Sequence, residues 1–109
     1  MPGAVILAAV GVLILVAGRL SAAGRLPRNG FVGIRIPSTM RSDRAWLAGH
    51  RAGAFALTMA GGGSAVIAIA SAMVSSNPSA PLISVAWLVA WTVVAAIKAN
   101  RAARDAEDR

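Results

Sequence analysis

The placement of the charged residues constrains this chain more than any other sequence feature. No Asp, Glu, Lys or Arg occurs in residues 1–18 or in residues 52–97. An Arg at the centre of a bilayer costs roughly 3 kcal/mol on insertion scales, so long uncharged stretches are typical of segments that lie in a membrane. Charged residues make up only 14% of the chain, whereas soluble domains carry about 25%. We therefore expect an all-α integral membrane protein.

Three parts of the chain are long and apolar enough to cross a bilayer. A helix needs about 20 mainly apolar residues to span a hydrocarbon core of about 30 Å. The sequence predicts a single membrane domain with spans at about residues 2–23, 52–76 and 80–98, a connecting loop at 24–51 and a tail at 99–109. Two prolines mark the short turn between the second and third spans, so these two are expected to form a helical hairpin.

The first span has one feature of a cleaved signal peptide, because Ser21-Ala22-Ala23 fits a small-residue cleavage site. A signal peptide, however, carries its positive charges before the apolar stretch. Here no Lys or Arg precedes the stretch, and all the basic residues of the chain follow it. We therefore expect this segment to remain as a transmembrane helix.

The basic residues indicate an orientation. All eleven lie in two blocks, one in residues 19–51 and the other in residues 98–109. Short loops that are rich in Lys and Arg stay in the cytoplasm, and two spans between the blocks place both on that side. We expect the N-terminus outside and the C-terminus in the cytoplasm. Abundant Arg, Ala and Gly are typical of a bacterium with a GC-rich genome, so the bacterial plasma (inner) membrane is the expected location.

The net charge of +7 would also suit a protein that binds nucleic acid. Such a protein does not need three uncharged apolar stretches, so we expect membrane lipids and no nucleic acid as partners of the basic residues. The chain has no Cys, one His and four acidic residues. These are too few ligands for a protein metal site, and we expect neither a metal nor another cofactor.

Small residues follow one face of the second span at intervals of three or four positions. Small side chains at this spacing let helices approach closely, which is how helices associate in lipid. The face consists of Gly49, Gly53, Ala56, Ala60, Ser64, Ala68 and Ala72. The run Gly61-Gly62-Gly63 lies at mid-span and predicts either very close packing or a kink. The partners of this face are the other two spans or, alternatively, a second protein.

Trp87 and Trp91 lie four positions apart in the third span and share a face of the helix. Trp residues of membrane proteins usually lie in the interfacial belts, whereas Trp87 falls near the middle of its span. A buried indole N–H needs an acceptor. Two interpretations stay open: an oxygen of the second span accepts this hydrogen bond, or the two rings face a partner protein.

The connecting loop is too patterned for a simple connector. Asn29 starts a turn signal, and the residues after it have an extended character that Pro37 favours. Ser42 is expected to cap a short interfacial helix that begins at Asp43 and continues directly into the second span. Trp46 on this helix is expected to lie among the lipid headgroups as an anchor.

Nine loop residues together resemble the signature of a known family. They are Asn29, Gly33, Ile34, Arg35, Pro37, Thr39, Trp46, His50 and Arg51. At these spacings they resemble the SdpI family of bacterial membrane proteins, which is named for an immunity protein that protects its producer from a secreted toxin and takes part in signalling. The resemblance implies a multi-pass membrane protein with a role in immunity or signalling.

For three of these residues the sequence suggests specific roles in the loop. Arg35 is expected to pair with a lipid phosphate or with a carboxylate of a partner. Alternatively its role is structural, and it satisfies backbone carbonyls or adds to the positive charge on the cytoplasmic side. Asn29 is expected to close its turn. His50 is expected to bond the loop backbone, since a catalytic or pH-sensing role would need a partner base or nucleophile.

These features predict a protein that is not an enzyme. It would act as an accessory subunit or as an immunity or signalling partner of another integral membrane protein, or as a homo-oligomer. The alternative is a small oligomeric transporter or lipid-handling protein, although uncharged spans argue against an ion path. A third hypothesis is an enzyme at the headgroup plane that uses Arg35, Asp43 and His50, for which the sequence identifies no nucleophile and no metal.

Overall fold

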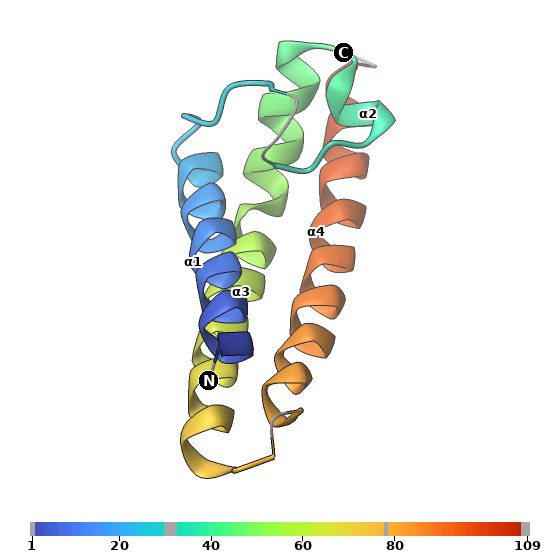
Figure 1. The fold of residues 1–109 in the computed structure, drawn as a ribbon. Coiled ribbons are helices and arrows are strands. Elements are labelled where there is room, and N and C mark those ends of the chain that lie inside the picture. The colour runs from blue at the N-terminus through green and yellow to red at the C-terminus, as the bar shows by residue number, and fades with distance from the viewer. Residues whose placement is uncertain (1, 30–32, 78, 108–109) are drawn as a thin grey trace.

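The computed structural model describes residues 2–29, 33–77 and 79–107, and its regular structure there is entirely helical (Figure 1). The elements are α1 (Pro2–Ala22), α2 (Pro37–Met40), α3 (Asp43–Val74), the 3₁₀ turn η1 (Ala80–Leu82) and α4 (Ile83–Glu107). The helices α1, α3 and α4 are each long and apolar enough to cross a membrane. The chain is therefore an all-α membrane protein with three transmembrane helices, as its charge pattern predicts.

Two of the long helices extend beyond the predicted spans. Ser42 caps α3 by accepting a hydrogen bond of 3.0 Å from the backbone N–H of Ala45, and the helix then continues to Val74. The expected run from the interfacial turns into the second span is thus confirmed. At the other end of the chain, α4 continues to Glu107, well past residue 98, because the Ala and Arg residues of the tail are strong helix formers.

The helix α3 is central to the bundle. Both α1 and α4 pack along α3, whereas they hardly touch each other (Figure 1). The molecule measures 53 × 20 × 19 Å, which is longer than a hydrocarbon core of about 30 Å. The loop, α2 and the last turns of α4 lie together at one end of the long axis, which we call the loop end (Figure 1). The turn between α3 and α4 lies at the opposite end.

Glycines bring α1 and α3 into backbone contact. A Cβ atom added to Gly11 would lie 2.6 Å from the carbonyl oxygen of Gly61. A Cβ on Gly61 would in turn meet backbone atoms of α1 at Gly11 and Leu15, so a side chain at this position requires α1 to move. The next residue differs, because a Cβ on Gly62 would meet only the Leu15 side chain at 3.7 Å. Close packing therefore explains the first glycine of the run.

The helix α4 packs on a second side of α3. A Cβ added to Gly53 would lie 3.1 Å from a backbone carbonyl oxygen of α4. Gly63 lies beneath the ring of Trp87, whose Nε1–H donates a hydrogen bond of 2.7 Å to the carbonyl oxygen of Met59. Ser64, by contrast, lies against α1. The small residues expected on one face are thus divided between two neighbouring helices.

Candidate functional site

Five of the nine loop residues form a cluster at the loop end, which we call the motif knot, and all of them except the exposed Gly33 are buried. The strip of residues 33–36, α2 and the first turns of α3 contribute them. The members are Gly33, Ile34, Thr39, Trp46 and His50. Trp46 and His50 are one helical turn apart, so their rings share a face of α3 and stack with centroids 4.0 Å apart at an interplanar angle of 25°. Only 2% of Trp46 and 1% of His50 is exposed.

His50 binds the loop backbone through both nitrogens of its ring. The backbone N–H of Ile34 donates a hydrogen bond of 2.8 Å to Nε2, so Nε2 carries no proton. The proton of the neutral ring therefore lies on Nδ1, which is 2.8 Å from the carbonyl oxygen of Trp46 and donates to it. Burial lowers the pKa of His50, which keeps the ring in this neutral form. The expected bond between His50 and the loop backbone is confirmed.

Thr39 holds the other side of the same peptide segment. Its hydroxyl is fully buried and donates a hydrogen bond of 2.6 Å to the carbonyl oxygen of Ile34. The hydroxyl oxygen of Thr39 in turn accepts a hydrogen bond of 3.2 Å from the backbone N–H of Ile36. Ile36 is extended, at φ −110° and ψ 162°, and Pro37 follows it as the first residue of α2. Side chains of the loop and of α3 thus satisfy both backbone polar groups of Ile34.

Gly33 permits this arrangement for two reasons. Its φ is +112°, a backbone conformation that residues with a side chain rarely adopt. An added Cβ would also lie 2.5 Å from Nε2 of His50 and 3.1 Å from the ring of Trp46. Any larger residue at this position would therefore separate the strip from α3.

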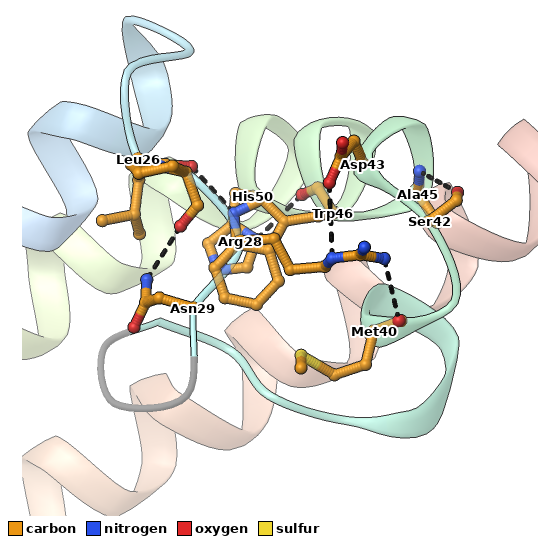
Figure 2. Close-up of polar contacts among 10 residues, drawn as sticks. Leu26, Arg28, Asn29, Met40, Ser42, Asp43, Ala45, Trp46 and His50 are labelled. Atoms are coloured by element: carbon orange, nitrogen blue, oxygen red, sulfur yellow. Dashed lines mark hydrogen bonds and ion pairs between the residues drawn. The ribbon is translucent and has the colours of Figure 1, made fainter.

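The expectation that Trp46 is a headgroup anchor is wrong. Its ring is buried, and its Nε1–H donates a hydrogen bond of 2.8 Å to the carbonyl oxygen of Leu26 (Figure 2). This acceptor lies twenty positions earlier in the chain, so helical periodicity alone does not reveal it. Trp46 thus ties the beginning of the loop to α3.

Polar contacts nearer the surface complete the loop end. Arg28 forms an ion pair of 3.3 Å with Asp43 and donates a hydrogen bond of 3.2 Å to the carbonyl oxygen of Met40 (Figure 2). The side-chain amide of Asn29 donates a hydrogen bond of 2.8 Å to the carbonyl oxygen of Pro27. The turn expected after Asn29 runs into residues 30–32, which lie outside the described residues.

Two arginines of the signature lie on the surface around the motif knot. Arg35 is exposed. Its neighbour Ile34, by contrast, is buried, with a side chain that is 7% exposed and with both backbone polar groups hydrogen-bonded. Arg51 is also exposed, and its guanidinium lies against the backbone at Gly24, where φ is +70°. The buried members of the signature thus hold a strip that presents Arg35.

A second feature lies in the membrane-spanning region. Phe55 of α3 meets Trp91 of α4 edge to face, with centroids 6.1 Å apart, and Trp91 lies 5.9 Å from Trp87. We call these three residues the aromatic ladder. Phe55 is 69% exposed, and both Trp rings are partly exposed. The hydrogen bond from Trp87 to Met59 confirms the expected acceptor in the second span.

The polar groups of the loop end are arranged so that they bind and position backbone. Both ring nitrogens of His50 are engaged with backbone groups, and Asp43 pairs with Arg28 (Figure 2). The headgroup-plane hypothesis needs His50 as a free base, and this geometry does not provide one. Among the described residues, no three His, Asp or Glu side chains gather in a way that could hold a metal ion.

Comparison with known protein families bears on the same part of the chain. The model of the SdpI/YfhL protein family matches residues 25–99, which include the loop, the motif knot, all of α3 and most of α4. The chain therefore belongs to the SdpI/YfhL family. Comparisons with curated proteins and with solved structures found no match.

Proposed function

We propose that this member of the SdpI/YfhL family is a non-catalytic subunit that binds another integral membrane protein in the bacterial inner membrane. The observation that carries the proposal is the aromatic ladder of Phe55, Trp87 and Trp91 on one side of the bundle. In this role the chain would act as an accessory subunit or as an immunity or signalling partner.

The position of the ladder supports a protein partner. Trp residues that only anchor a helix lie in the interfacial belts, whereas Trp87 precedes Lys98, the first charged residue of α4, by eleven positions. At about 1.5 Å per residue, this places it roughly 16 Å inside that boundary. Its N–H is already bound within the molecule, so the outward face of the ring is free to pack. Large rigid aromatic rings are frequent among the residues that dominate binding.

The structure of the loop end supports a non-catalytic role. Two of its buried polar side chains, His50 and Thr39, bond to backbone groups of the same loop. These groups order the loop and are not free to transfer protons to a substrate. We therefore assign the signature to the positioning of the loop.

Photo-crosslinking in living cells tests the partner. A photoreactive phenylalanine analogue at position 55 should give a discrete crosslinked product, which Trp91→Ala should weaken. The same analogue at position 93, in place of the exposed Val93, is the matched control and should give none. A product of twice the chain mass identifies a second copy as the partner. Equal crosslinking from both positions, or none from position 55, contradicts the proposal.

The proposed orientation places the loop end in the cytoplasm, because ten of the eleven basic residues lie between residue 25 and the C-terminus, outside the uncharged stretches, and the eleventh is Arg19 at the end of α1. The chain has no Cys, so a single Cys can be introduced cleanly. A membrane-impermeant maleimide added to intact spheroplasts should label Asn77→Cys and should leave Arg41→Cys unlabelled until the membrane is broken. The reverse pattern contradicts this orientation.

A lipid-handling role is the second candidate. The observation that favours it is an apolar groove between α1 and α4, whose lining includes no residue of the aromatic ladder. No charged side chain lies in residues 52–97, which disfavours transport of ions.

A further inference from the structure

A groove runs along the membrane-spanning part of the molecule between α1 and α4. It arises because both helices pack on α3 and hardly touch each other. Its volume is about 510 Å³, which is within the range of about 300–1,000 Å³ that is usual for ligand pockets. Leu13 and Ala17 of α1, Leu57 of α3 and Ala96 of α4 contribute to its apolar lining. Leu13 is 69% exposed, so the groove can be entered from the side that faces lipid.

Two polar side chains in the lining lie toward the loop end. The strip of residues 33–36 closes the groove there and contributes the exposed Arg35. Gly53 shows which part of α4 lies level with the strip. A Cβ added to Gly53 would lie 3.0 Å from the Ile34 side chain and 3.1 Å from the carbonyl oxygen of Ala95, so the strip lies near Ala95 along the bundle. Thr92 also lines the groove and precedes Ala95 by three residues, so it lies about 4.5 Å deeper along α4.

This order of groups matches that of a glycerophospholipid. A guanidinium at the headgroup level suits a phosphate, a hydroxyl slightly deeper suits an ester carbonyl, and the aliphatic walls below suit an acyl chain. Basic pockets between transmembrane helices are known to bind anionic headgroups.

The charge of Arg35 is not neutralised within the described part of the chain. Asp43, the acidic residue of the loop, is bonded to Arg28, and Asp105 lines a different cleft beside Arg44 and Arg51. The motif knot also restrains the backbone on which Arg35 stands, because both polar groups of Ile34 are bound. A restrained backbone reduces the conformational entropy that is lost when Arg35 binds an anion.

We propose that the groove between α1 and α4 binds one anionic glycerophospholipid. Its phosphate pairs with Arg35, an ester carbonyl accepts the hydroxyl of Thr92, and one acyl chain lies against α1 and α4. This site is independent of the aromatic ladder, so its test does not depend on a protein partner.

Native mass spectrometry of the purified full-length chain in mild detergent tests the proposal. The probes are dioleoyl-phosphatidylglycerol, which is anionic, and dioleoyl-phosphatidylcholine, which has the same chains and no net charge. We expect one phosphatidylglycerol per chain, bound about tenfold more tightly than phosphatidylcholine, because the choline ammonium of the latter compensates the phosphate charge that faces Arg35. Arg35→Gln should abolish this preference. Arg41→Gln, which removes an exposed charge from the same loop away from the groove, should preserve it.

Three further binding measurements test whether the lipid lies in the groove. Thr92→Val should weaken the binding of both lipids about fivefold, which is the effect of losing one neutral hydrogen bond. Ala96→Phe should fill the groove and prevent binding of one lipid per chain, and Leu13→Trp serves the same purpose from an exposed position if the first variant misfolds. Glycerol 3-phosphate should not displace the lipid, because it lacks the acyl chain.

Several outcomes would overturn the proposal. The first is equal binding of the two lipids by the unmodified chain. The second is an equal loss of preference in Arg35→Gln and Arg41→Gln, which would indicate a diffuse basic surface. The third is undiminished lipid binding in well-folded Ala96→Phe and Leu13→Trp. The fourth is crosslinking of a photoreactive group at position 13 to another protein in cells. This result would make the groove a binding site for a helix of that protein.

Discussion

The two parts of α3 hold their neighbours by different physical means. Near the loop end, Trp46 and His50 direct hydrogen bonds to backbone groups of the loop. Farther along, Gly61 holds α1 by having no side chain at all. In lipid no hydrophobic force drives helices together, so close packing must supply the association. At the loop end an irregular backbone must be satisfied, so directed polar groups are needed there.

The largest effect is expected from Gly61→Ala, because its Cβ would meet backbone atoms of α1 that cannot rotate away. We expect a loss of about 3 kcal/mol in the free energy of unfolding, at the upper end for overpacking. Gly62→Ala is the matched control, since its Cβ has an ordinary contact at 3.7 Å. It should be neutral or stabilising by up to about 1 kcal/mol through helix propensity. Reversible unfolding in detergent measures both, and equal effects would contradict the packing account.

The next effect is expected from His50→Phe. Phe preserves a ring against Trp46 but cannot accept the N–H of Ile34, which is left buried without a partner. The expected loss is about 1–3 kcal/mol, and it should be confined to the loop end. Trypsin should cleave after Arg35 faster than in the unmodified chain. Leu47→Phe, at an exposed position on the same helix, should leave the cleavage rate unchanged. A resistant His50→Phe loop would show that this bond does not order the strip.

A pH dependence separates the two regions further. The folded pKa of His50 lies below its ordinary value of 6.5, so below that pH the unfolded chain binds a proton that the folded chain does not. Stability contributed by His50 is therefore complete above pH 6.5 and is lost as the pH falls below it. The stability difference between the unmodified chain and His50→Phe should shrink from pH 7.5 to pH 5. The difference in stability between the unmodified chain and Gly61→Ala should stay constant over this range. If the difference between the unmodified chain and His50→Phe grows on acidification, the assignment of a neutral His50 ring is wrong.

The smallest effect is expected from Arg28→Gln. The ion pair between Arg28 and Asp43 joins side chains that are 37% and 88% exposed, so water and salt screen it. We expect a change of no more than about 0.5 kcal/mol, measured by the same unfolding assay. A loss as large as that of His50→Phe would mean that surface charge, and not the motif knot, orders the loop.

The sequence predicted the local features well, and the long-range contacts poorly. Uncharged stretches revealed the three spans, and Ser42 with Asp43 marked the start of α3, because these signals depend on neighbouring residues. The burial of Trp46 depends on Leu26, which is distant in sequence, and no periodicity encodes that contact. The division of the small residues between α1 and α4 likewise depends on where three helices meet.

Hydrogen exchange at the backbone amide of Ile34, in nanodiscs, tests the central claim that His50 holds the strip which presents Arg35. This amide should be protected in the unmodified chain at pH 7.5 and should lose protection in His50→Phe, while amides in the middle of α3 stay protected in both. If the Ile34 amide exchanges as fast as an unprotected amide in the unmodified chain, His50 does not hold the strip and the assigned positioning of Arg35 is wrong.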